Sequence, residues 1–235
     1  MGQKIHPYSF RLGYIRDWKS RWFAKNRDFG TLLIEDSKIR KHIKKNLQQA
    51  AVAMIEIERA SNRIRIIIHS GRPGVIIGRK GVEIDRLKEE LRGIVDKEVL
   101  IDIKEIKRPF LSAQLVSTNI AFQLEKRVLF RRAMKRAVQQ AMTQGAGGIK
   151  IMCRGRLDGS EIARKEVYKQ GKVPLQTIKA DVAYGFSEAH TTAGLVGIKV
   201  WIYTGDIIVG KKEPKKDLNA DPQKGVQHGI DAKKS

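Results

Sequence analysis

The stretch Val75-Ile76-Ile77-Gly78-Arg79-Lys80-Gly81 decides how the middle of this chain folds and what it contacts. Gly78 and Gly81 lack a Cβ atom, so the backbone can approach a sugar-phosphate chain closely and adopt conformations that other residues resist. Arg79 and Lys80 add positive charge between the two glycines. A helix that starts after Gly81 would point free N–H groups and the positive end of its dipole at the same place. We therefore take Gly78, Arg79, Lys80 and Gly81 as candidate RNA-binding residues.

Other glycine-rich motifs do not fit this stretch. A P-loop requires Gly-Lys followed by Ser or Thr, whereas Lys80 is followed by Gly81. A dinucleotide-binding fingerprint requires Gly-x-Gly-x-x-Gly directly after a strand, and the first glycine pair is absent. An ordinary surface loop is the remaining alternative, because an isolated Gly-x-x-Gly pattern is a weak signal. The basic residues inside the motif and the order of the elements around it favour RNA binding instead.

The elements expected around the loop occupy residues 38–107. Apolar residues that recur every four positions predict a helix over 37–49, which Asp36 or Ser37 can cap. The order helix, strand, strand, short helix, glycine loop, helix, strand is typical of a KH-type RNA-binding domain. After the first helix, the expected elements are strands at 55–58 and 63–68, a short helix at 75–77, a helix at 84–95 and a strand at 99–103.

Residues 108–210 also mix helices with strands. Helices are expected at 112–127 and 129–143, and Gly145 ends the second. Both halves of the chain therefore predict the α+β class, with the helices of the second domain packed on a mostly antiparallel sheet. Alternating apolar residues predict strands near 149–153, 178–184 and 196–202.

The net charge of this 235-residue chain points to a polyanionic partner. It carries 47 Lys and Arg against 25 Asp and Glu, a net charge of +22. Such an excess attracts nucleic acid. Lysines that merely keep the chain soluble, and an anionic membrane surface, are the alternatives. We expect no membrane contact, because no apolar run is long enough to span a bilayer and no basic amphipathic anchor is present.

Cysteine and histidine usage argues against a metal or a disulfide. Cys153 is the only cysteine, so a single chain can form neither a disulfide nor a thiolate zinc site. The five histidines show no metal-ligand spacing. We expect no metal, no cofactor, no catalytic residue and no small-molecule substrate, and a reducing, cytoplasmic location.

The first 37 residues predict a basic arm, because basic residues alternate with aromatic ones. Guanidinium planes and rings of this kind stack on bases in RNA complexes. The alternative is that the aromatic residues Trp18, Trp22 and Phe23 dock on the protein's own core. At the other end, residues 211–235 are rich in Lys, Asp, Pro and Gly and predict a disordered tail. The candidate RNA-binding residues of the arm are Lys4, Arg11, Arg16, Lys19 and Arg21.

The helix expected at 129–143 has a strongly basic face. Six basic residues and no acidic one lie between positions 126 and 136. Like charges one helical turn apart repel each other, and a bound polyanion would relieve that cost. A solvated basic face is the alternative, but we favour phosphate contact beside an RNA-binding domain. The candidate residues are Arg127, Arg131, Arg132, Lys135 and Arg136.

Several motifs together resemble the bacterial small-subunit ribosomal protein S-three family, from position 2 to about position 210. Besides the glycine loop, they lie at the start of the chain, in the basic helix and in the second domain. The matching stretches are Met1-Gly2-Gln3-Lys4-Ile5-His6-Pro7, Phe130-Arg131-Arg132-Ala133-Met134-Lys135-Arg136-Ala137, Gly155-Arg156-Leu157, Glu161-Ile162-Ala163-Arg164, Ser187-Glu188-Ala189-His190-Thr191-Thr192 and Gly197-Ile198-Lys199-Val200-Trp201-Ile202.

The resemblance implies a type II KH domain (α-β-β-α-α-β) followed by a family-specific α+β domain. It implies a place in the head of the small ribosomal subunit, bound to small-subunit (16S) rRNA and beside ribosomal proteins ten and fourteen. It also implies that residues matching Arg131, Arg132 and Lys135 contact messenger RNA (mRNA) where it enters the subunit and help to unwind it. Asp158 departs from the pattern, since many members have a glycine there.

Two other functions remain open from the sequence. A free KH-type RNA-binding regulator is one, although such proteins often carry repeated KH modules and this chain has one. A nucleic-acid lyase is the other, and it would need a reactive lysine amine that no residue pattern here identifies. We therefore expect a structural, RNA-positioning protein of the ribosome that is not an enzyme.

Overall fold

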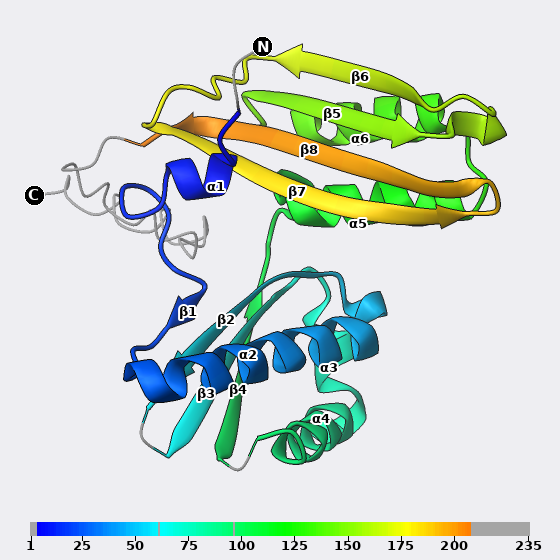
Figure 1. The fold of residues 1–235 in the computed structure, drawn as a ribbon. Coiled ribbons are helices and arrows are strands. Elements are labelled where there is room, and N and C mark those ends of the chain that lie inside the picture. Colours follow the sequence, from blue (N-terminus) through cyan, green and yellow to red (C-terminus); the bar gives the residue numbers. More distant parts are fainter. Residues whose placement is uncertain (1–3, 61, 96, 208–235) are drawn as a thin grey trace, which may run out of the picture.

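The computed structural model describes residues 4–60, 62–95 and 97–207, and it consists of two α+β units (Figure 1). Each unit is a four-stranded sheet with helices on one face. The predicted fold class is thus confirmed. The expected tail, 211–235, lies outside the described residues.

The first unit has the order α-β-β-α-α-β that the sequence predicts for a KH domain. Its sheet has the order β1-β2-β3-β4, where β1 is the short strand Ser20–Arg21; β2 pairs antiparallel with β3, and the two outer pairs are parallel. Isoleucines alternate along β3, and Ile64, Ile66 and Ile68 are completely buried under the helices. The elements are α2 (Asn26–Asn46), β2 (Val52–Arg59), β3 (Arg63–Ser70), α3 (Pro73–Ile77), α4 (Val82–Arg92) and β4 (Glu98–Glu105).

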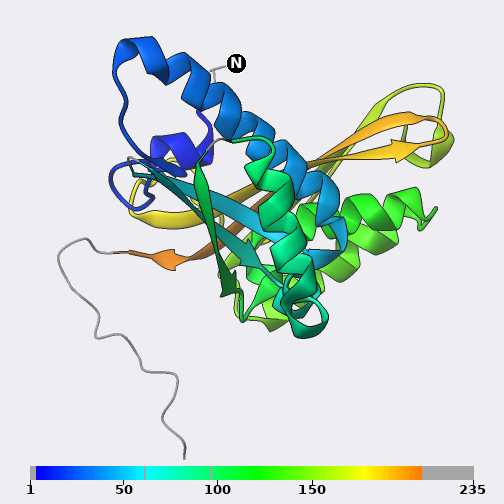
Figure 2. The ribbon, with the colours of Figure 1, turned by 90° about the horizontal axis from the view of Figure 1, so that it is seen from below.

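Helices α2 and α4 run side by side on this sheet (Figure 2). Polar side chains join them at the surface: His42 Nε2 lies 2.9 Å from Glu90 Oε2, and the Asn46 amide donates to the same oxygen at 2.6 Å. Below these contacts, Ile39, Ile43 and Leu91 form the core with the sheet.

The second unit is a fully antiparallel sheet, order β6-β5-β8-β7, with α5 and α6 on one face (Figure 1). Alternation along β5 and β8 turns Ile149, Ile151, Cys153 and Val200 toward those helices, where all four are completely buried. The elements are η3 (Pro109–Leu111), α5 (Ala113–Glu125), α6 (Phe130–Thr143), β5 (Gly148–Gly155), η4 (Leu157–Gly159), β6 (Arg164–Gly171), β7 (Ala180–Thr191) and β8 (Gly194–Asp206).

The region expected to be an irregular arm is more ordered than predicted. It contains α1 (Pro7–Phe10) and the two-residue strand β1 (Ser20–Arg21), and α2 begins at Asn26 rather than near position 37. Asp36, expected to cap the helix, instead lies buried within it. A carboxylate in an apolar stripe hides the helical period, which is why the sequence places the helix start too late.

Candidate nucleic-acid interface

The glycine loop has the backbone that its sequence predicts. It links α3 to α4 through the short helix η2 (Arg79–Gly81), and Gly78 and Gly81 have φ angles of +69° and +84°. A Cβ atom on Gly78 would lie 2.5 Å from Glu83 Cγ, so this position has no room for a side chain. No side chain caps the N-terminus of α4 after Gly81, although the Val82 N–H already donates to the carbonyl oxygen of Arg79.

The surroundings of the loop are less positive than the motif suggests. The Arg79 side chain is exposed, but Glu83 and Asp85 occupy the first turn of α4 and offset its positive dipole end. The Lys80 side chain lies outside the described part of the structure. Of the preceding apolar residues, Ile76 is buried, while Val75 and Ile77 are exposed beside the loop. The loop remains a candidate for RNA contact through backbone and apolar groups.

Arg11 requires a correction, because the structure uses it as an internal link and not as an RNA contact. Its side chain is completely buried. The guanidinium donates to the carbonyl oxygen of Ala180 at 2.6 Å and to that of Thr177 at 2.8 Å, with further bonds to the carbonyls of Pro7, Pro174 and Leu175. These bonds tie α1 to the start of β7, and the guanidinium is buried among carbonyl oxygens, where no phosphate can reach it.

RNA contact by the other basic residues of the arm stays a prediction, and these residues differ in how far their charge is already compensated. Arg16 pairs with Asp181, and Arg21 lies 3.0 Å from Asp17 and within 4 Å of two glutamates, so both charges are partly compensated. The arm therefore mainly links the two units. Lys4 is exposed, whereas Lys19 Nζ lies 4.7 Å from the centre of the Tyr8 ring and burial lowers the pKa of this lysine.

Of the aromatic residues of the arm, one docks on the protein's own core and two are exposed. Trp22 docks on the protein, where its Nε1 donates to Asp36 Oδ2 at 2.9 Å and its ring lies 5.3 Å from that of Phe29. Trp18 and Phe23, in contrast, are 60% and 95% exposed. Those two rings are available to a partner, whereas Trp22 is a structural residue.

Helix α6 carries the most strongly basic surface among the candidate sites. Its buried face, which includes Ala133, Met134 and Ala137, packs on the second sheet. The opposite face exposes four cations with no acidic residue on the helix. Arg127 is also exposed, just before α6, with a φ angle of +61°. The exposed cations of α6 are Arg131, Arg132, Lys135 and Arg136.

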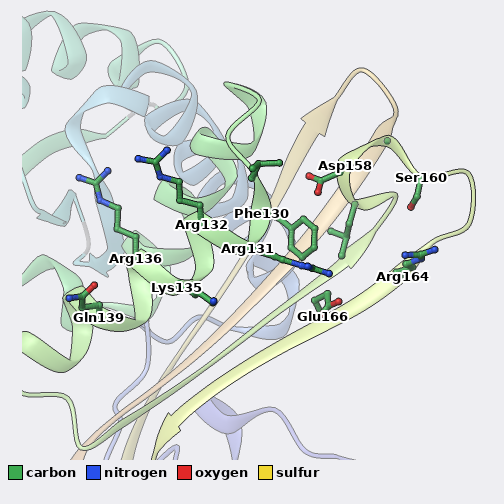
Figure 3. Close-up of a pocket in the computed structure, with 13 residues that line it drawn as sticks. Phe130, Arg131, Arg132, Lys135, Arg136, Gln139, Asp158, Ser160, Arg164 and Glu166 are labelled. Carbon is green, nitrogen blue, oxygen red and sulfur yellow. The ribbon is translucent and has the colours of Figure 1, made fainter.

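A cavity of about 1070 Å³ opens between α6, η4 and the start of β6. In Figure 3, Arg131 points from α6 toward β6, while Arg132 and Arg136 point away from the strand. All four exposed cations of α6 line the cavity, and Arg164 on β6 adds a fifth. Asp158 and Glu166 are the acidic residues on its wall. Within the described residues, the five cations form no ion pair with a carboxylate.

Sequence reasoning missed Arg164 as a site residue. The available signal was its place in the matching stretch that ends at Arg164, but nothing local shows that β6 returns beside α6. The backbone at position 158 accounts for both the glycine of the family pattern and the aspartate of this chain. Asp158 has a φ angle of +52°, in the left-handed region that favours glycine and that aspartate tolerates better than most residues.

The described residues contain no group of three or more His, Cys, Asp or Glu side chains arranged to hold a metal ion. Among the same residues, we find no helix whose length and apolar content would suit a membrane span.

Two family models match the chain. One, described as "KH domain", covers residues 38–111; the other, described as "Ribosomal protein S3, C-terminal domain", covers residues 120–202. The first includes the glycine loop, and the second includes α6 and the whole second sheet up to Ile202.

Similar proteins cover nearly the whole chain. A protein of Caldicellulosiruptor saccharolyticus named "Small ribosomal subunit protein uS3" is 57% identical over 212 residues, which is 90% of this chain and 96% of the relative. Proteins with the same name from Dictyoglomus turgidum and Koribacter versatilis are 51% and 55% identical, and the alignments cover 98% and 92% of this chain and 94% and 97% of those relatives.

Proposed function

Because the chain belongs to the uS3 family of small ribosomal subunit proteins, we propose that it holds messenger RNA at the basic face of α6 while other surfaces anchor it on rRNA. The family is a structural component of the ribosome and not an enzyme. The observation that carries the proposal is the α6 cavity, where five cations line one open space without an ion pair among the described residues.

The arrangement suits a phosphodiester strand. Arginine presents a planar fork of N–H donors that matches phosphate oxygens in pairs, and Arg131, Arg132 and Arg136 lie within two turns of one helix. Arg164 on β6 lines the same cavity, and of the three arginines it is Arg131 that points toward that strand (Figure 3). The packed apolar side of α6 fixes the helix, so the cations are held in place before RNA arrives.

Such a surface would act on a moving message by charge and position alone. Contacts to phosphates are independent of sequence, as passage of every message through one channel requires. Cations that bind the single strand more tightly than the duplex also oppose its return to the duplex, because pairing would give up those contacts. The unwinding role of Arg131, Arg132 and Lys135 follows from this grip and needs no catalytic residue.

The remaining partners are part of the proposal. The glycine loop at Gly78 to Gly81, together with Lys4 and Lys19, would contact small-subunit (16S) rRNA in the head of the subunit. Ribosomal proteins ten and fourteen are the protein neighbours, and the location is the ribosome of the cytoplasm. The free-regulator alternative predicts instead that the chain sediments apart from small subunits in a magnesium-containing lysate.

Translation of structured and unstructured messages tests the role of α6. We expect Arg131→Ala, Arg132→Ala and Lys135→Ala, combined in assembled ribosomes, to slow passage through a stable hairpin about tenfold, as expected when a few phosphate contacts are lost. Passage along an unstructured message should change less than about twofold. The matched control replaces Lys38, Lys41 and Lys45, three exposed lysines of α2, by Ala and should leave the ratio unchanged. Equal slowing on both messages contradicts the proposal.

A further inference from the structure

The outer face of the second sheet is a surface that the function proposed above does not use. Helices α5 and α6 cover the inner face. Among the described residues, α1 crosses the outer face on the β7 side, and the residues before it run over β8 toward β5 (Figure 1). His6 packs there edge-to-face on Tyr184, with ring centres 4.6 Å apart. The rest of this face carries side chains of β6, β5 and β8.

The strand register arranges these outward residues in three rows across the sheet. Rows are two residues apart along each strand, about 6.8 Å, and neighbouring strands are about 4.8 Å apart. From β6 to β7, the rows are Lys169, Lys150, Trp201 and Tyr184; then Val167, Met152, Lys199 and Phe186; then Lys165, Arg154, Gly197 and Glu188.

Positive charge on this face is concentrated and uncompensated. Lys150 lies directly opposite Lys169, and Arg154 directly opposite Lys165, which are unfavourable pairs in a sheet. Glu188 is the only carboxylate in the three rows. None of the five cations forms an ion pair with any residue that the structure describes. Burial lowers the pKa of Lys150, and the nearby charges of Lys4, Lys165 and Lys169 lower it further.

Aromatic rings lie among the cations. Lys150 Nζ is 5.2 Å from the centre of the Trp201 ring, and Lys199 Nζ is 6.0 Å from that of Phe186. Phe186 is 42% exposed, and the Trp201 ring is itself 5.6 Å from that of Tyr184. A base stacked on either ring would bring its phosphate within reach of a lysine. Open antiparallel sheets with exposed rings bind unpaired RNA bases in this way.

We propose that the outer face of the β6-β5-β8-β7 sheet is a binding site for single-stranded RNA, with bases on Trp201 and Phe186 and phosphates on the surrounding lysines. The site is separate from the α6 cavity, because α6 packs on the opposite face of the same sheet. Lys4 extends it from the arm, which gives that exposed cation a place beside Lys150. The high ratio of cations to carboxylates favours RNA over a protein partner.

The test uses the full chain with the α6 face silenced by Arg131→Gln, Arg132→Gln and Lys135→Gln. Binding of a fluorescent single-stranded RNA of about twelve nucleotides, several times the length that a four-stranded platform stacks, is measured by anisotropy at several salt concentrations. The sheet variant adds Lys150→Gln, Lys165→Gln, Lys169→Gln and Lys199→Gln. The control adds Gln at Lys38, Lys41, Lys45 and Lys107, four exposed lysines elsewhere, so that net charge is matched.

We expect the sheet variant to bind at least about tenfold more weakly than the control and to lose about 0.7 of salt slope for each phosphate contact removed. Trp201→Leu with Phe186→Leu should weaken binding about 30-fold or more while all lysines remain, because two stacked bases are lost. Phe186→Leu alone, with an expected loss of about 5-fold or more, serves if the pair does not fold. Sheet and control variants that bind alike overturn the proposal. So does a sheet variant that keeps RNA affinity but no longer joins small subunits, since the face would then dock a protein.

Discussion

Arg59 donates two hydrogen bonds to one oxygen of Asp36, from Nε at 2.9 Å and from Nη2 at 2.7 Å, and both side chains are almost completely buried. The second oxygen of Asp36 accepts from the Ser20 hydroxyl at 3.0 Å and from Trp22 Nε1 at 2.9 Å. One carboxylate thus joins β1, α2 and the end of β2. It is the point at which the basic arm is fastened to the KH unit.

We predict that Asp36→Ala lowers the free energy of unfolding by about 3–5 kcal/mol, because the buried guanidinium of Arg59 loses its buried carboxylate partner and keeps only Glu35, which is 2.8 Å away and partly exposed. Urea unfolding of the purified chain measures the loss. Asp85→Ala is the matched control: Asp85 pairs with Lys88 at 3.0 Å on the surface of α4, and we expect less than about 1 kcal/mol. A loss below about 1 kcal/mol for both variants would show that the Asp36 site adds nothing beyond a surface pair.

A second prediction separates the two glycines of the RNA-binding loop. Gly78 has φ and ψ angles of +69° and −172°, a region open to glycine almost alone, and its Cβ would overlap Glu83. Gly81 lies in the ordinary left-handed region with free space around it. We expect Gly78→Ala to destabilise the chain by about 2–4 kcal/mol and Gly81→Ala by about 1 kcal/mol.

Urea unfolding of both loop variants gives the comparison. Equal losses would mean that the Glu83 contact relaxes without cost. Gly78→Asp and Gly81→Asp should also weaken crosslinking of the loop to RNA, because each adds a negative charge at the proposed phosphate contact. Unchanged crosslinking would remove the loop from the interface.

The sequence predicts the elements of both units because their cores follow regular periods. The prediction of elements fails where a polar residue occupies a core position of a helix, or where a strand lacks alternating apolar residues. Asp36 sits in the buried stripe of α2 between Leu32 and Ile39, so the helix looks as if it starts there. Strand β6 was not predicted for a related reason. It is an edge strand with Lys165 and Lys169 outward and Glu166 and Gln170 inward, so it lacks an apolar alternation.

The basic residues show the same limit at the level of function. Charge patterning finds the α6 face because its cations share one helix. It cannot distinguish Arg11, which bonds to carbonyls more than 160 positions away, from Lys4, which stays exposed. Nor can it join Arg164 to α6, since only the return of β6 in three dimensions brings them to one cavity.

A third prediction follows from the buried place of Arg11. Arg11→Met should lower the free energy of unfolding by about 2–4 kcal/mol, because several carbonyl oxygens lose a charged donor. RNA affinity, measured where the variant is folded, should not change. Arg92→Met removes an exposed arginine of α4 and should cost less than about 0.5 kcal/mol. Loss of affinity in folded Arg11→Met would restore the earlier prediction that Arg11 contacts RNA.

The last prediction concerns the single thiol. Cys153 is completely buried between the second sheet and its helices, and burial raises the pKa of its thiol from 9.0 to about 12. Below pH 9 the thiol is protonated in both the folded and the unfolded chain, so it adds no pH dependence. Between these pKa values the unfolded chain releases a proton that the folded chain retains. Stability then falls as pH rises, by about 1.4 kcal/mol per pH unit.

Cys153→Ala isolates this effect. Both proteins contain the same tyrosines and lysines, whose titration above pH 9 changes both alike, and the smaller side chain lowers stability equally at every pH. Urea unfolding at about pH 9 and about pH 10 should therefore show an extra loss of about 1 kcal/mol in the unaltered chain that the variant lacks, because the unfolded thiol is already half ionised at pH 9. Parallel losses would mean that the folded thiol ionises as readily as the unfolded one. Rapid labelling of the folded chain by a thiol reagent near pH 8 would also contradict the prediction, because a buried, protonated sulfur is a poor nucleophile.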